Sequence, residues 1–158
     1  MNAYSSDSGR AIETANLVLK YSEQSKLKLE NMWDVVGKAA GVASPEELMK
    51  FSIQEVINLI RVADPTKQAE DWELFSTRIK AEIDKISEEA AGNGGGNVLV
   101  VVHGLLITTL IEMLDSSKTK LGVENASVTK IVYQDGTYTV ESVGDMSYVA
   151  KGKESVEI

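Results

Sequence analysis

The sequence predicts an α/β fold in which helices flank a mostly parallel sheet and a hairpin closes the chain. The run "VLVVVHG" (98–104) holds five consecutive apolar residues, which is typical of a parallel strand covered on both faces. Stretches with helical apolar spacing lie before and after it. Near the C-terminus two alternating runs are joined by Asp135-Gly136, a pair that favours a type I′ hairpin.

The first predicted elements are a strand, a helix and a second strand. "YSS" (4–6) has the pattern of a strand end, and Ser6, Asp7 and Ser8 offer N-cap side chains to the helix that follows. "KLKLE" (26–30) alternates between polar and apolar residues, so we expect a short strand there.

Two helix starts are predicted in the middle of the chain. Ser44, Pro45 and Glu47 form a capping-box pattern with proline at the first helical position, which predicts a helix through "SPEELMKFSIQEVINLI". A second start at Asp64-Pro65 leads into a long amphipathic helix, which "GNGGGN" (92–97) should end.

The remaining segments predict a helix over "LLITTLIEML" (105–114), the closing hairpin and a loose polar tail over residues 151–158. No repeat or linker divides the chain. We therefore expect one α/β domain over residues 1–150.

Composition excludes several classes of function. The net charge is −8 and the 16 basic residues are scattered, which argues against a nucleic-acid partner. The chain has no cysteine and one histidine, so disulfides, thiolate chemistry and histidine-rich metal cages are excluded, and we expect neither metal nor cofactor. No stretch reaches the length of a membrane span and no leader pattern opens the chain, so we expect a cytoplasmic protein without a membrane partner.

The single histidine stands at a position that favours an anion. His103 and Gly104 follow the valine-rich strand and precede a helix, where open α/β sheets bind ligands beside free N–H groups. Glycine there lets the backbone approach a ligand closely. The alternative is a histidine packed at a strand end with a structural role.

Two further side chains are expected at the same edge of the sheet. Arg10 lies in the first turn after the strand ending in "YSS", and a guanidinium can grip phosphate bidentately. Glu30 closes "KLKLE", and a carboxyl group facing phosphate is suited to act as a general acid. Taken alone, each is more simply a solvated surface residue.

Together these segments resemble the histidine phosphatase superfamily, in its phosphoglycerate-mutase-like branch. "YSSDSGRAIETANLVL" resembles the family segment "SS-x-x-x-R-A-x-x-T-A", and "NVLVVVHGLLITTLI" resembles its second histidine motif. "LKLEN" is similar to the segment with the family's acidic residue, although "MWDVVG" departs from the usual continuation. "ENASVTKIVYQDGTYTVESVGDMSY" resembles its closing hairpin.

The resemblance implies phosphoryl transfer or hydrolysis of small phosphomonoesters through a phosphohistidine. On this chain it implies Arg10, His103 and Gly104 as phosphate-binding residues, and His103 and Glu30 as catalytic residues. The family's nucleophilic histidine lies in an N-terminal "R-H-G" motif that ends a central strand. This sequence contains one histidine, already matched to the second motif. The resemblance therefore implies an N-terminally truncated chain without its first central strand and with little or no turnover.

These considerations leave three hypotheses. The first is a truncated phosphoglycerate-mutase-like phosphatase, whose partners would be a small phosphorylated metabolite or inorganic phosphate. The second is a non-catalytic phosphate-binding or protein-interaction module, and the third is an α/β domain in which His103 is structural. A missing central strand would expose strand edges, so we also expect a homodimer or a strand-exchanged oligomer.

Overall fold

The computed structural model describes residues 2–6, 8–19, 26–29 and 51–155. The chain divides into two compact units, Met1–His103 and Gly104–Ile158, and each is described by itself. The prediction of one domain over residues 1–150 stays a prediction. The elements of the first unit are β1 (Asn2–Ser6), α1 (Gly9–Leu19), β2 (Lys26–Leu29), α4 (Ile53–Ala63), α5 (Trp72–Gly92) and β3 (Val98–Val101). Those of the second are α6 (Gly104–Leu114), the 3-10 helix η1 (Ser116–Lys118), β4 (Val128–Gln134), β5 (Thr137–Asp145) and α7 (Ser147–Glu154).

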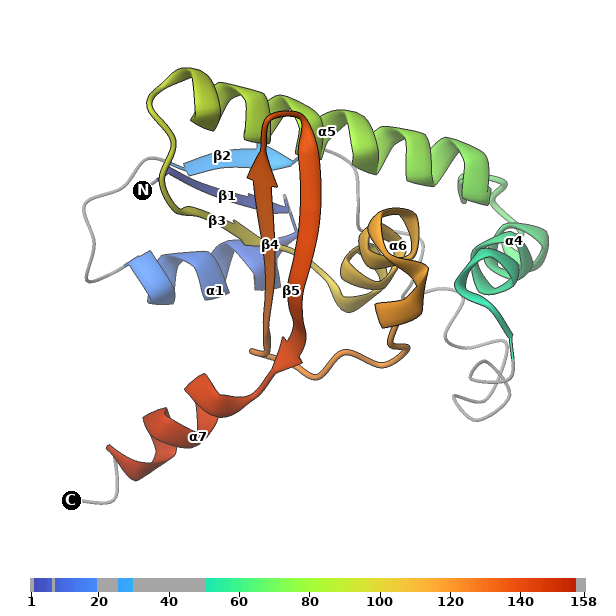
Figure 1. Ribbon diagram of the computed structural model, residues 1–158. Helices are drawn as coiled ribbons and strands as arrows, with labels where there is room; N and C mark the ends of the chain where they lie inside the picture. The colour runs from blue at the N-terminus through green and yellow to red at the C-terminus, as the bar shows by residue number, and fades with distance from the viewer. Residues whose placement is uncertain (1, 7, 20–25, 30–50, 156–158) are drawn as a thin grey trace. The chain divides into compact units, whose positions relative to one another are not determined.

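The first unit is built on a three-stranded parallel sheet in the order β2-β1-β3 (Figure 1). Successive side chains of a strand point to opposite faces. Ala3 on the central strand packs against Ala15 of α1, and Leu99 and Val101 add to that small cluster. Tyr4 faces the other way and reaches Glu89 of α5, so helices cover both faces of β1. The predicted α/β class with a mostly parallel sheet is confirmed.

The valine-rich strand is less enclosed than its composition predicts. All four residues of β3 are partly exposed, although five consecutive apolar residues predict burial on both faces. Among the described strands, β3 has a hydrogen-bonded neighbour on one side, β1, whereas β1 has one on each side. An edge position explains why Ala3 and Tyr4 of β1 are 1% and 4% exposed while β3 is not buried.

Of the two helix starts predicted in the middle of the chain, one is wrong and the other falls on residues that the structure does not describe. The predicted start at Ser44 lies outside the described residues, and residues 51 and 52 are not helical. α4 begins at Ile53, where Ser52 and Glu55 form a complete capping box. The predicted start at Asp64 is wrong, because Asp64 ends α4 instead and α5 begins after its own N-cap, Asp71.

The second unit contains the predicted helix and hairpin. Asp135 and Gly136 both have positive φ, 51° and 78°, which is the geometry of a type I′ turn, so this prediction is confirmed. Tyr133 and Tyr138 face each other across the strands with ring centroids 4.8 Å apart. The segment predicted as a loose tail differs, because α7 continues through residue 154.

Candidate functional site

The carboxyl ends of β1 and β3 lie side by side at one edge of the sheet. Ser5 of β1 is in register with Val101 of β3, and both strands run in the same direction. The residues that follow the two strands therefore emerge at the same edge, which is where open α/β sheets bind ligands. His103 follows β3 there, and the first turn of α1 follows β1.

A hydrogen bond joins the two strand ends. The hydroxyl Oγ of Ser6 lies 3.2 Å from Nε2 of His103, across 97 positions of sequence. Ser6 is fully buried, at 0% exposure, and His103 is partly exposed. The backbone N–H of Ser8 donates to the same hydroxyl at 3.4 Å. The structure thus places the sole histidine at the predicted edge and gives it a buried serine partner.

Sequence reasoning did not assign Ser6 this role. It treated the hydroxyl as a candidate helix cap, whereas this hydroxyl accepts from the amide of Ser8, which precedes α1, and contacts His103. The amides of Ala11 and Ile12 donate to the backbone carbonyl of Ser8 at 3.0 Å each. The available signal was the placement of a serine at the last position of a predicted strand. The strand order that brings it to His103 is a tertiary property.

Arg10 is the second residue of α1 and is exposed at its first turn. Its carbonyl accepts a hydrogen bond from the hydroxyl of Thr14 at 2.9 Å, an ordinary interaction within the helix. The first turn of α1 contains no acidic residue, so no carboxylate of that turn opposes an anion at the positive end of the helix. Arg10 thus lies at the N-terminus of a helix, four residues after Ser6, the serine that contacts His103.

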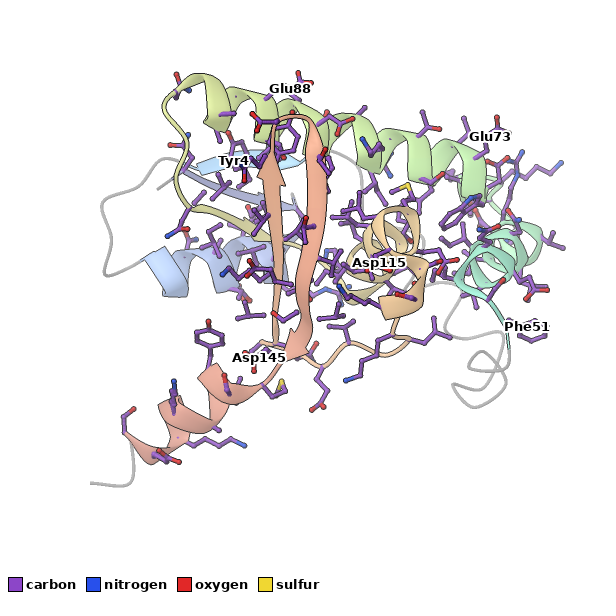
Figure 2. All side chains as sticks on the ribbon, viewed as in Figure 1. Tyr4, Phe51, Glu73, Glu88, Asp115 and Asp145 are labelled. Atoms are coloured by element: carbon purple, nitrogen blue, oxygen red, sulfur yellow. The ribbon has the colours of Figure 1, made fainter. Side chains whose placement is uncertain are left out.

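Behind the strand ends, β1 is fixed to α5 by a buried tyrosine. The hydroxyl of Tyr4 donates to Oε2 of Glu89 at 3.4 Å, and Figure 2 shows Tyr4 between the sheet and α5. Burial first, and then the adjacent Glu89 carboxylate, raises the pKa of Tyr4 above its usual 10.0. Tyr4 is therefore a neutral donor at neutral pH, which suits a structural contact.

The roles predicted for the two other site residues, Glu30 and Gly104, stay predictions. Glu30 lies outside the described residues. Gly104 opens α6 in the second unit, and a Cβ at that position would lie 3.5 Å from the carbonyl oxygen of Val123, an ordinary contact. The absence of a side chain at Gly104 is thus not a steric requirement of the second unit, and its proposed role in phosphate binding stays a prediction.

Within the described ranges, no three or more histidine, cysteine, aspartate and glutamate side chains are grouped so that they could hold a metal ion. Across that same part of the chain, no helix combines the length and the apolar character needed to cross a membrane.

Comparison with known proteins places these features in context. The model of the histidine phosphatase superfamily (branch 1) matches residues 1–146. The crystal structure of phosphoglycerate mutase from Bacillus anthracis str. Sterne is 84% identical, with a TM-score of 0.80 over 97% of this chain and 76% of that chain. No curated protein matches the chain.

More distant structures share the fold. Bacillus stearothermophilus YhfR is 20% identical, with a TM-score of 0.62 over 94% of this chain and 75% of that chain. The alpha-ribazole phosphatase from Shigella flexneri is 18% identical, with a TM-score of 0.58 over 90% and 72% of the two chains. At these identities the likeness concerns the fold alone.

Proposed function

The chain belongs to the histidine phosphatase superfamily, branch 1, and on that premise we propose that it handles small phosphomonoesters at the paired ends of β1 and β3. The observation that supports this most directly is the hydrogen bond between Ser6 and His103, which ties the two strand ends together beside the first turn of α1. The 84% identity to a phosphoglycerate mutase supports phosphoryl transfer of the mutase type.

In this proposal Arg10 and His103 bind the phosphate group. The guanidinium of Arg10 supplies a fixed positive charge with a fork of donors that matches two phosphate oxygens. The imidazole supplies one further donor from the neighbouring strand. Gly104 contributes its backbone N–H and Glu30 protonates the leaving oxygen, both as the family resemblance implies.

We further propose that a polypeptide of these 158 residues turns over little substrate. The family route uses one histidine as nucleophile and a second to hold the phosphoryl group, and this sequence contains one histidine. If His103 holds the phosphate, no imidazole in the sequence is left to form the covalent intermediate that divides the reaction into two easier steps.

An activity assay combined with anion binding tests this proposal. We expect no hydrolysis of an aryl phosphate above background, together with a higher Tm in inorganic phosphate or vanadate than in chloride of equal ionic strength. Ligand at roughly a hundred times its Kd adds about 2.7 kcal/mol to the free energy of unfolding. The protection should disappear in His103→Gln.

Two outcomes would contradict the proposal. Turnover that is lost in His103→Ala would mean that the remaining histidine acts as nucleophile, which contradicts the predicted inactivity. Equal Tm values in phosphate, vanadate and chloride would contradict the phosphate site itself.

We also propose that the chain associates with a second copy of itself through β3. This apolar strand has one hydrogen-bonded neighbour among the described strands, and unpaired strand edges are templates for association. Sedimentation equilibrium over a range of concentrations should give a mass above that of one chain. A single monomeric mass at every concentration would contradict the proposal.

A further inference from the structure

Donor and acceptor counts indicate which of Ser6 and His103 donates the hydrogen bond between them. A serine hydroxyl has one proton to donate and two lone pairs that accept. The Ser8 N–H already occupies one lone pair of the Ser6 hydroxyl at 3.4 Å. Ser6 is fully buried, so its proton needs an acceptor within the protein.

Among the described residues, Nε2 of His103 is an acceptor within reach of that proton, at 3.2 Å. A neutral imidazole carries its proton on one nitrogen and accepts at the other. If Nε2 accepts from Ser6, the ring proton must lie on Nδ1. The reverse direction, with Nε2–H donating to Ser6, would leave the buried hydroxyl proton without an acceptor among the described residues.

We propose that Ser6 is a positioning residue that holds His103 in the Nδ1–H tautomer and fixes the direction of its ring at the edge of the sheet where phosphate is proposed to bind. This inference rests on the proposed function for the phosphate, whereas the tautomer itself can be measured without any ligand. Ser6 does not touch the anion in this scheme. It acts through the imidazole, as hydrogen-bonded partners of functional histidines do elsewhere.

The chain offers a matched control on the same strand. Ser5 is 2% exposed, adjacent to Ser6 and equally a serine of β1. Neighbouring residues of a strand point to opposite faces, so the Ser5 hydroxyl points away from the face of Ser6. Ser5→Ala therefore removes the same atom from the same strand without removing the partner of Nε2.

Because the chain has one histidine, its imidazole gives an unambiguous NMR signal. Long-range ¹H–¹⁵N spectra in alkaline buffer, where the ring is neutral, report the tautomer from the two nitrogen shifts. We expect the Nδ1–H form to dominate in the wild-type chain and in Ser5→Ala. In Ser6→Ala the two forms should mix, as they do in free histidine.

The same samples are then titrated with inorganic phosphate. A neutral hydrogen bond is worth roughly 0.5–1.5 kcal/mol, which corresponds to a Kd for phosphate about two- to tenfold weaker in Ser6→Ala. Ser5→Ala should keep the wild-type Kd. Ser6→Cys, with a weak thiol donor in a similar volume, should fall between the wild type and Ser6→Ala and covers the case in which Ser6→Ala does not fold.

The outcomes separate this inference from the proposed function. A tautomer that is unchanged in both Ser6 variants would overturn the inference, whatever the affinity for phosphate. A tautomer that depends on Ser6 in a chain that binds no phosphate would support the positioning contact and overturn the proposed function. A shifted tautomer together with a weaker Kd supports both.

Discussion

The junction between α4 and α5 and the ends of β1 and β3 both gather polar side chains, but they do so over very different distances in the sequence. At the junction, Asp64 accepts from residues two to five positions later, and the amide of Trp72 donates to Asn58 at 2.9 Å across 14 positions. At the strand ends, Ser6 meets His103 across 97 positions.

This difference distinguishes polar side chains that stabilise local structure from polar side chains that form the candidate site. The junction satisfies its backbone amides with nearby side chains, as helix termini and turns generally do. The strand ends bring together a buried hydroxyl and a partly exposed imidazole, and this contact between distant residues is not needed to form a local turn. Substitutions in the two regions should therefore change different quantities.

The largest expected effect is at Arg10. Arg10→Gln should weaken phosphate binding by roughly tenfold to a hundredfold, because a hydrogen bond to a charged group is worth about 1.5–3 kcal/mol. The Tm should change little, since Arg10 is exposed in the first turn of α1. Calorimetric titration with inorganic phosphate measures the affinity.

Arg61→Gln is the matched control in the junction. Arg61 forms an ion pair with Asp71, and both side chains are substantially exposed, at 48% and 34%. Exposed ion pairs contribute about 0–1 kcal/mol, so the free energy of unfolding should fall slightly while the Kd for phosphate stays unchanged. If Arg10→Gln bound phosphate like the wild type, the distinction between the two regions would fail.

Local patterns predicted most of the fold. Alternation identified β2 and the hairpin, and the positive φ at Asp135 and Gly136 follows from the residue types that a type I′ turn requires. The helix starts were predicted less well. Asp64 and Pro65 have the local pattern of a helix start, but Asp64 ends α4, and the caps that open α4 and α5 are Ser52 and Asp71.

The candidate site was predicted only in part. His103 could be placed at a strand end because a strand followed by His-Gly and a helix is a local pattern. Its contact with Ser6 depends on β1 and β3 being neighbours, and strand order is set by packing over the whole unit. The same limit applies to β3, since its apolar composition predicts a buried strand but cannot show that it lies at an edge of the described sheet.

A smaller effect is expected at the start of α4. The hydroxyl of Ser52 accepts from the Glu55 amide at 3.2 Å, while the Ser52 amide donates to the Glu55 carboxylate at 2.8 Å. Ser52→Ala removes the first of these bonds and should lower the free energy of unfolding by about 1 kcal/mol. Urea denaturation measures the change, and Ser52→Thr should retain most of the stability because it keeps the capping oxygen. A Ser52→Ala chain as stable as the wild type would show that this capping box does not stabilise the fold.

The last expected effect, at Asp64, depends on pH. Its Oδ1 accepts from the amide and hydroxyl of Thr66, and its Oδ2 accepts from the amides of Gln68 and Ala69 at 2.8 Å each. These bonds, led by that of the Thr66 hydroxyl, lower the pKa of Asp64 from 3.8 to about 2. Asp64→Asn keeps one acceptor oxygen but presents an amide NH₂ to the donors at Oδ2.

The pH dependence of that variant tests whether the junction acts independently of the strand ends. A carboxyl group whose pKa is lower in the folded state stabilises the fold fully above its unfolded pKa of 3.8, and loses that contribution as the pH falls towards about 2. The difference in urea midpoint between wild type and Asp64→Asn should therefore be constant near neutral pH and shrink over this acidic range. Thr66→Val removes the hydroxyl that contributes most to the lowered pKa of Asp64, so it should raise the acidic end of this range towards 3.8. The Kd for phosphate at neutral pH should be the same in Asp64→Asn and Thr66→Val as in the wild type, because the Asp64 carboxylate accepts from groups at most five residues away. A changed Kd would mean that the junction and the strand ends are energetically coupled.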